Sequence, residues 1–235
     1  MNYTVAILAG GLGTRLQPVI KDQPKVLAEV NGHPFLEYLL NQINSAGFKE
    51  VVICVGYLGD QIKNRFGEKY KNLNLSYSPE QSLLETGGGL KLALPFFKSE
   101  IILVLNGDSF CNIHLKDFLD FHLGKKANAS LALIQVNDTS RYGKVTLDKD
   151  DKITGFKEKG EGGPPGPGLI NAGIYLINRS LISMIPMRVV SLEKEVFPKW
   201  VGQSFYGFKT NTSFIDIGTP ESYQKAEEFF AKFNL

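Results

Sequence analysis

Short, almost wholly apolar runs alternate with amphipathic stretches along the first half of the chain. Residues 5–8, 51–55 and 101–106 are nearly continuously apolar, which is typical of strands buried on both faces of a parallel sheet. The stretches between them carry apolar residues at helical spacing and predict helices over residues 34–46, 60–66 and 86–94. Repeated strand–helix–strand units predict a doubly wound α/β sheet that is mixed but mostly parallel.

The second half of the chain predicts the rest of this sheet and a small antiparallel β extension. Segments 143–147 and 153–157 flank a polar turn and predict a β-hairpin. Glycine and proline dominate residues 161–168, which excludes helix and central strand there and predicts a mobile loop. Since no internal repeat or linker interrupts the pattern, it predicts a single domain over residues 1–235. The other predicted elements are helices at 115–123, 192–200 and 220–233 and strands at 130–136, 169–177, 205–209 and 214–217.

Composition and charge limit the partners that the protein is expected to bind and the cellular compartment in which it is expected to work. The 235 residues are 43% hydrophobic and 21% charged, an ordinary globular mix that excludes a wholly disordered chain. With 26 Lys and Arg against 24 Asp and Glu, the net charge of +2 is too balanced to attract nucleic acid or an anionic membrane. Cys54 and Cys111 lack CxxC spacing, which argues against zinc and disulfides and favours the reducing cytoplasm. The apolar run at 5–8 is too short for a signal peptide or a membrane span.

A glycine-rich loop directly after the first predicted strand is the strongest chemical signal. Its glycines let the backbone turn sharply and present N–H groups to phosphate oxygens, while Arg15 adds a cation. Gln17 stands where a Walker A loop needs lysine, and Leu16 where a dinucleotide fingerprint needs its third glycine. The loop therefore predicts a polyphosphate site of neither familiar kind, with an ordinary glycine turn as the alternative.

Three charged residues are expected near this loop. Lys25 follows Pro24 in a stretch expected to be extended, and it either provides a charge for phosphate or is an ordinary surface lysine. Asp108 comes directly after a buried strand, at the edge where open α/β sheets bind ligands; its carboxylate suits Mg²⁺, with a plain turn aspartate as the alternative. Asp216 lies between two isoleucines and needs a partner, either a metal shared with Asp108 or a structural ion pair.

A second glycine cluster occupies residues 84–90, between a strand and a helix. Such a loop offers N–H and C=O groups to the edge of a flat ring, as nucleobase recognition requires, or simply forms a tight helix N-terminus. The histidines His33, His114 and His122 fall away from both glycine clusters. Their positions argue against a Ser/His/Asp triad and against a histidine-rich metal site.

Together these motifs resemble those of the sugar-1-phosphate nucleotidyltransferase family, the glucose-1-phosphate thymidylyltransferase-like enzymes. The resemblance covers nearly the whole chain and keeps the family's order. Its motifs are the glycine loop with Arg15, Pro24-Lys25, Glu85-Thr-Gly-Gly88, Asn106-Gly-Asp108, Arg141-Tyr-Gly143, Phe156-Lys-Glu-Lys159, Asn171-Ala-Gly173 and Asp216-Ile-Gly218. A narrower similarity, to the bacterial D-glycero-D-manno-heptose 1-phosphate guanylyltransferases, rests on Pro34-Phe-Leu-Glu-Tyr38, Ser140-Arg-Tyr-Gly143, Gly168-Leu-Ile-Asn171 and Ser191-Leu-Glu193.

The resemblance implies a Mg²⁺-dependent enzyme that moves a nucleotidyl group from a nucleoside triphosphate, GTP in the narrower similarity, to a sugar 1-phosphate. It implies Arg15, Lys25 and Asp108 as catalytic groups, and Asp108 with Asp216 as metal ligands. The implied nucleotide-binding residues are Leu8, Ala9, Gly10, Gly11, Gly13, Thr14 and Arg15, with Glu80 or Gln81 and with Gly87 and Gly88 at the base. The implied sugar-phosphate-binding residues are Gly143, Glu158, Lys159, Asn171 and Glu193.

The chemistry expected of such a site is in-line attack of a sugar phosphate oxygen on the α-phosphorus, with pyrophosphate leaving and no covalent protein intermediate. The product would be a nucleotide sugar for surface polysaccharide, and a homodimer is compatible with the resemblance. Several alternatives stay open: another sugar such as mannose or glucose, another nucleotide (TTP, UTP or CTP), or a non-catalytic regulatory protein that binds nucleotide sugars. A weaker alternative is a nicotinamide-dependent enzyme that holds the ribose with Asp22 or Glu29.

Overall fold

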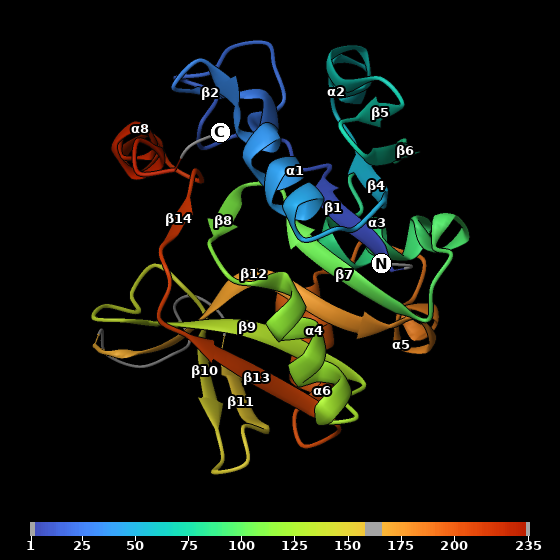
Figure 1. Ribbon diagram of the computed structural model, residues 1–235, viewed down its shortest axis with the longest axis vertical. Helices are drawn as coiled ribbons and strands as arrows, with labels where there is room; N and C mark the ends of the chain where they lie inside the picture. The colour runs from blue at the N-terminus through green and yellow to red at the C-terminus, as the bar shows by residue number, and fades with distance from the viewer. Residues whose placement is uncertain (1–2, 158–165, 234–235) are drawn as a thin grey trace.

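A ten-stranded mixed sheet forms the centre of the protein (Figure 1). The computed structural model describes residues 3–157 and 166–233. One half of the sheet is parallel: β1 pairs with β4 and β7, and β4 pairs with β6. A short strand, β5, closes this edge antiparallel to β6. The bounds are β1 (Thr4–Ala9), β4 (Glu50–Val55), β5 (Lys69–Tyr70), β6 (Leu73–Pro79) and β7 (Ile101–Asn106).

The other half of the sheet is built around one long strand, β12. This strand runs antiparallel to β7, β9 and β10, while β13 continues from β9 in parallel and β11 forms a hairpin with β10. The register between β12 and β9 shifts between Asn171 and Tyr175, at Gly173 with its φ of +75°. The bounds are β9 (Ala129–Val136), β10 (Lys144–Leu147), β11 (Ile153–Lys157), β12 (Gly168–Asn178) and β13 (Phe205–Thr210).

Helices cover both faces of the sheet, as the continuous apolar strands predict. Val5 and Ile7 of β1 belong to one hydrophobic core and Ala6 to the other, and all three side chains are fully buried. The first core takes in α1 and α4, which lie toward the viewer in Figure 1, and the second takes in α3, α5 and α6. The bounds are α1 (Phe35–Ser45), α2 (Gly59–Phe66), α3 (Glu85–Leu92), α4 (Leu115–Gly124), α5 (Arg179–Met184) and α6 (Phe197–Trp200).

Two small antiparallel sheets flank the main one. The first joins β2 (Glu29–Val30) to β3 (His33–Pro34), and the second joins β8 (Ser109–Cys111) to β14 (Phe214–Asp216). The second sheet connects the end of β7 to a segment about a hundred residues further along the chain. It therefore brings two distant parts of the sequence to the same edge of the main sheet.

The predicted doubly wound, mostly parallel sheet and its antiparallel β extension are confirmed, but three local predictions are wrong. The closing helix over 220–233 divides into α7 (Pro220–Gln224) and α8 (Ala226–Phe230), because Lys225 has a ψ of −11°. The helix over 192–200 begins as a π-helical turn, η3 (Leu192–Val196), just before Pro198, which has no N–H to donate. The stretch expected to be extended at Lys25 forms a 3₁₀ turn, η1 (Lys25–Leu27).

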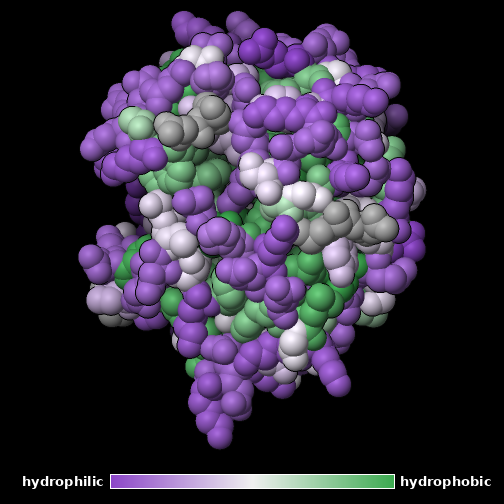
Figure 2. Space-filling model, viewed as in Figure 1, coloured by the Kyte–Doolittle hydropathy of each residue, from purple (hydrophilic) through white to green (hydrophobic). Residues whose placement is uncertain are grey.

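Short turns, loops and a mostly polar surface complete the described part of the molecule. Another 3₁₀ turn, η2 (Leu94–Phe96), follows α3. Residues 161–165 of the predicted glycine- and proline-rich loop lie outside the described part of the chain, and Gly168 opens β12. The face of the molecule seen in Figure 2 is mostly hydrophilic, with apolar patches between polar areas. Within the described residues, no helix combines the length and apolar character that crossing a bilayer requires.

Candidate active site

A cavity of about 620 Å³ opens at the carboxyl ends of β1, β4, β6 and β7. Parallel strands end together at this edge, which is where open α/β sheets bind ligands. The cavity reaches from the glycine-rich loop after β1, across Asp108, to Asn171 on β12 and to Glu193 in η3. Its volume is that of a site for a small organic ligand or cofactor.

The glycine-rich loop lies against Glu80, the residue that follows β6. A Cβ atom at Gly10 would come within 2.5 Å of Glu80 Oε1, and one at Gly56 within 2.7 Å of the same atom. A Cβ atom at Gly56 would also lie 2.5 Å from the Gly10 carbonyl oxygen, so glycine at position 56 allows the two backbones to meet beside this carboxylate. Glu80 Oε2 accepts a hydrogen bond from the Leu84 backbone N–H at 3.1 Å, and burial raises the pKa of Glu80 above its ordinary value.

Lys25 and Asp108 form an ion pair in the lining of the cavity, at the end that the glycine-rich loop borders. The distance from Lys25 Nζ to Asp108 Oδ2 is 2.6 Å. The lysine side chain is 12% exposed and the aspartate side chain 41% exposed, so the ammonium group is largely enclosed while the carboxylate stays open to the cavity. Gly107 lets the chain turn out of β7 beside Leu8, since a Cβ there would lie 2.7 Å from the Leu8 carbonyl oxygen.

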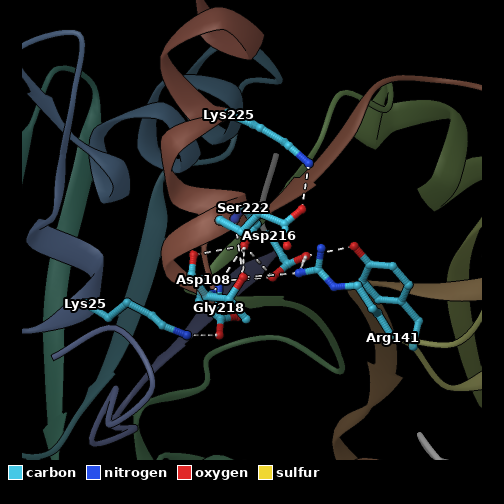
Figure 3. Close-up of polar contacts among 10 residues, drawn as sticks. Lys25, Asp108, Arg141, Asp216, Gly218, Ser222 and Lys225 are labelled. Atoms are coloured by element: carbon cyan, nitrogen blue, oxygen red, sulfur yellow. Dashed lines mark hydrogen bonds and ion pairs between the residues drawn. The ribbon is translucent and has the colours of Figure 1, made fainter. Parts of the chain in front are cut away.

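Asp216 lies beside Asp108 because β14 pairs with β8. In that ladder Asp216 stands opposite Ser109, and the Ile217 N–H donates to the Asp108 carbonyl oxygen at 2.8 Å. The Asp216 carboxylate accepts hydrogen bonds from Tyr142 Oη at 2.8 Å and from the Gly218 N–H at 3.0 Å. Figure 3 shows the two aspartates together, with Lys25 on one side and Arg141 on the other.

Cations gather around the two aspartates. Arg141 Nη2 lies 3.7 Å from Asp216 Oδ2, so the predicted structural ion pair of Asp216 is present. A Cβ atom at Gly218 would lie 3.6 Å from Arg15 Nη2 and 3.9 Å from Lys25 Nζ, which places both of these groups near Asp216 as well. Burial and the charge of Asp216 raise the pKa of Tyr142, so this phenol stays a hydrogen-bond donor at neutral pH.

The far end of the cavity is organised around the Glu193 carboxylate. Its Oε2 accepts hydrogen bonds from Thr86 Oγ1 at 2.7 Å and from Ser191 Oγ at 3.0 Å, and its Oε1 accepts from Tyr175 Oη at 3.1 Å. Asn171 Nδ2 in turn donates to Tyr175 Oη at 2.9 Å. A network of polar side chains therefore joins α3, β12 and η3.

Nearly every predicted site residue lines this cavity. Gln81 is exposed outside the lining, and Gly87 and Gly88 are buried against the backbone of residues 188–192 rather than against the cavity. Glu158 and Lys159 lie outside the described residues. The sequence does not indicate Tyr175, because the residue lies within an apolar strand, and it indicates no separate role for Thr86, whose side-chain partner is distant in sequence.

The molecule is a doubly wound α/β protein with a cavity at the carboxyl edge of its sheet, lined by a glycine loop, two aspartates and cationic side chains that include Arg15, Lys25 and Arg141. Residues 4–232 match the model of the nucleotidyl transferase family, and the chain belongs to that family. The resemblance noted from the sequence motifs is thus confirmed.

Relatives with assigned activities span the same length. The chain is 35% identical to the D-glycero-alpha-D-manno-heptose 1-phosphate guanylyltransferase of Aneurinibacillus thermoaerophilus, with 94% of this chain and 96% of the relative aligned. It is 39% identical to the enzyme of the same name from Campylobacter jejuni, covering 92% of this chain and 95% of the relative. The structure of HddC from Yersinia pseudotuberculosis complexed with GMP-PN superposes with a TM-score of 0.85 at 34% identity, covering 97% of this chain and 99% of that one.

Proposed function

We propose that this protein is a guanylyltransferase that joins GTP to a sugar 1-phosphate, D-glycero-D-manno-heptose 1-phosphate, and releases pyrophosphate. The observation that carries the proposal is the convergence of Arg15, Lys25, Asp108 and Asp216 at one end of the cavity, in a chain similar along its whole length to heptose 1-phosphate guanylyltransferases. Two anionic substrates must meet in this reaction, and the site brings cations and metal-binding carboxylates to one place.

We assign the triphosphate of GTP to the glycine-rich loop. Backbone N–H groups freed by Gly11 and Gly13 can donate to phosphate oxygens, and Arg15 and Lys25 supply charge. Lys25 is suited to the reacting phosphate because Asp108 fixes its ammonium group. Removing one such preorganised donor from a site of this kind slows a reaction by about two to three orders of magnitude.

We assign the choice of base to Glu80. A carboxylate is an acceptor only, and guanine presents two neighbouring donors on one edge, its ring N–H and its amino group. Adenine lacks that pair of donors, so a carboxylate at this place favours GTP over ATP. Glu80 lines the cavity beside Gly10, and its position is fixed by the hydrogen bond from the Leu84 N–H.

We assign the sugar phosphate to the opposite end of the cavity, at Asn171, Glu193 and the Gly143 backbone, with Glu158 and Lys159 as further groups implied by the family motif. The amide of Asn171 and the carboxylate of Glu193 are suited to sugar hydroxyls, which both donate and accept hydrogen bonds. The two ends of the cavity would then place the sugar phosphate and the α-phosphorus next to Lys25 and Asp108.

The donor set fits a magnesium ion. Asp108, in the turn between β7 and β8, and Asp216, at the end of β14, provide hard carboxylate oxygens close together, and the described residues contain no cluster of three or more His, Cys, Asp or Glu. Mg²⁺ commonly binds one or two carboxylates and completes its shell with phosphate oxygens and water. When bound, the ion would neutralise charge on the phosphates, and Asp108 and Asp216 would hold it.

In the proposed reaction, an oxygen of the sugar 1-phosphate attacks the α-phosphorus of GTP in line with the leaving pyrophosphate. One P–O bond forms and one breaks, and no protein nucleophile takes part. The protein contributes alignment of the two substrates and the positive charge of Arg15 and Lys25, because charge on the phosphate oxygens is the main obstacle.

We also propose that residues 1–235 act as one domain in the cytoplasm, making a nucleotide sugar for surface polysaccharide. One sheet collects strands from residue 4 to residue 210, which supports a single unit. Both cysteines, Cys54 and Cys111, are buried and free, which fits a reducing compartment. A homodimer stays a prediction, and sedimentation of the purified chain tests it.

A substrate grid tests the proposal. The protein is incubated with Mg²⁺, each of the five common nucleoside triphosphates and a panel of sugar 1-phosphates, and pyrophosphate is measured. We expect pyrophosphate with GTP and the heptose 1-phosphate above all other pairs. Release with another pair would replace the assigned substrates, and no release with any pair would favour a nucleotide-sugar-binding regulatory protein.

The variant Asp108→Asn tests the metal assignment in the same assay. The substitution keeps the shape of the side chain but removes its charge, so we expect pyrophosphate release to fall by about a hundredfold or more while the circular dichroism spectrum stays unchanged. Turnover equal to the wild type would remove Asp108 from the metal site.

A further inference from the structure

The Thr86 hydroxyl contacts the sugar end of the cavity, although Thr86 belongs to the glycine cluster that the sequence assigned to the base. Thr86 Oγ1 donates to Glu193 Oε2 at 2.7 Å, and it accepts a hydrogen bond from the Leu192 N–H at 2.9 Å. Both partners belong to η3 and lie more than a hundred residues away in the chain. The hydroxyl's single hydrogen is thus used, and one of its two acceptor positions is filled.

Backbone hydrogen bonds hold Thr86 and Glu193 in this register. The N–H groups of Gly87 and Gly88 donate to the Val190 carbonyl oxygen at 2.8 and 3.1 Å, and the Val190 N–H donates to the Leu84 carbonyl oxygen at 3.0 Å. A Cβ at Gly87 would lie 2.9 Å from the Val190 carbonyl oxygen, so the small residues of the cluster allow this contact. The glycines of the cluster join α3 to the segment before η3.

The other oxygen of Glu193 is held from the opposite side. Tyr175 Oη, on a fully buried ring, donates to Oε1 at 3.1 Å and itself accepts hydrogen bonds from Asn106 and Asn171. A carboxylate has about four acceptor positions, two on each oxygen. Thr86 and Ser191 occupy both positions on Oε2 and Tyr175 occupies one on Oε1, which leaves one on Oε1.

We infer that Thr86 is a positioning residue for the sugar phosphate: its hydroxyl fixes the Glu193 carboxylate so that the single remaining acceptor position of Oε1 receives one sugar hydroxyl. This inference rests on the proposed function, which puts the sugar at Glu193. It separates the roles within residues 84–90, because the only donor of the Thr86 side chain is given to Glu193 at the sugar end of the cavity and not to the nucleotide.

Two substitutions at Thr86 test the inference. Thr86→Val keeps the shape and removes the hydroxyl, whereas Thr86→Ser keeps the hydroxyl. Losing a hydrogen bond to a charged group weakens binding by about tenfold or more. We therefore expect Thr86→Val to raise KM for the heptose 1-phosphate about tenfold while KM for GTP stays within about twofold of the wild type. Thr86→Ser should restore the KM of the wild type.

A second variant keeps the inference testable if Thr86→Val disturbs the backbone at Leu192. Tyr175→Phe removes the donor to Oε1, together with the acceptor that Asn106 and Asn171 use at the same end of the cavity, and we expect the same selective rise in KM for the sugar phosphate. Tyr38→Phe is the matched control, since Tyr38 is also buried but its hydroxyl donates to the Val30 carbonyl oxygen, away from the cavity. Its two KM values should equal those of the wild type.

The outcomes separate this inference from the proposed function. If the wild type turns over but Thr86→Val raises both KM values equally or leaves both unchanged, the inference is overturned and the function stands. The same holds if Thr86→Ser is as impaired as Thr86→Val. If the wild type releases no pyrophosphate with any substrate pair, the proposed function is overturned and this inference with it.

Discussion

At the scale of single residues, the two aspartates of the site differ in their surroundings. Asp108 is 41% exposed and has one cation, Lys25, as its partner. Asp216 is 20% exposed, and Tyr142, Arg141 and the Gly218 N–H hold its carboxylate. Asp216 is therefore the more rigid of the two, and Asp108 is the one whose orientation depends on Lys25.

Lys25→Met is the variant that tests this dependence. It keeps most of the apolar stem and removes the ammonium group, so Asp108 loses its cation and the phosphates lose a charge. We expect kcat to fall by about two to three orders of magnitude with little change in secondary structure. The measurement is steady-state release of pyrophosphate together with circular dichroism.

Lys98→Met is the control for Lys25→Met. Lys98 also pairs with a carboxylate at 2.6 Å, that of Glu50, but its side chain is 74% exposed and neither residue lines the cavity. Exposed pairs contribute about 1 kcal/mol or less to stability, so this variant should keep the kcat of the wild type. A Lys25→Met enzyme as active as the control would exclude Lys25 from the reaction.

At the scale of elements, α8 carries a cluster of aromatic side chains that supports the site from behind. Phe230 is 2% exposed and packs on Tyr38 of α1 with ring centroids 3.8 Å apart. It also meets Phe110 of β8 at 5.0 Å. Because β8 pairs with β14, which ends in Asp216, this packing helps to hold the ladder that joins the two aspartates.

Phe230→Ala should destabilise the protein by about 3 to 5 kcal/mol, the usual effect of removing a buried aromatic ring. Urea unfolding followed by fluorescence measures the change. Phe96→Ala, at a ring that is 41% exposed, is the matched control and should change stability by less than about 1 kcal/mol. Equal effects of the two variants would contradict the packing described for α8.

Another element is anchored by a buried histidine. His122 of α4 is 1% exposed, and its Nδ1 lies 2.9 Å from Ser130 Oγ on β9. Burial lowers the pKa of His122 below its ordinary value of 6.5, so the folded protein binds this proton more weakly than the unfolded chain. The neutral His122 therefore contributes to the free energy of unfolding. This contribution is complete above the pKa that His122 has in the unfolded chain, and it is lost as the pH falls below that pKa.

We therefore expect wild-type stability to fall between about pH 7.5 and about pH 5.5, and His122→Gln to reduce that fall. Urea unfolding of both proteins at the two pH values measures the difference. The quantity compared is the change in the free energy of unfolding between the two pH values. The free energy of unfolding at a single pH is not compared, because the substitution changes that as well. An unaltered slope in the variant would show that His122 does not titrate as its burial indicates.

At the scale of the whole molecule, the sequence predicts three of the four parallel strands, because strands such as 51–55 are apolar without interruption and glycines end their helices. It does not predict β6, in which buried and exposed residues largely alternate. It also predicts Asp108, since an acid directly after a buried strand must lie at the ligand edge. It does not predict which acid Asp108 meets, because the pairing of β8 with β14 joins segments about a hundred residues apart.

Other features of the site depend on tertiary contacts that no local pattern encodes. Lys25 begins a 3₁₀ turn rather than an extended segment, and its partner is 83 residues away. Tyr175 appears in the sequence as one apolar position among many, and only its three side-chain hydrogen bonds give it a role. Glu193 is positioned by Thr86, which the sequence groups with the base.

Isotopic labelling follows the α-phosphate of GTP through the proposed reaction. The protein is given Mg²⁺, the heptose 1-phosphate and GTP carrying a radioactive α-phosphorus, and the products are separated by chromatography. We expect the label to move into a GDP-sugar while unlabelled pyrophosphate appears in equal amount. Label recovered as free GMP, or left in GTP with no pyrophosphate formed, would contradict it.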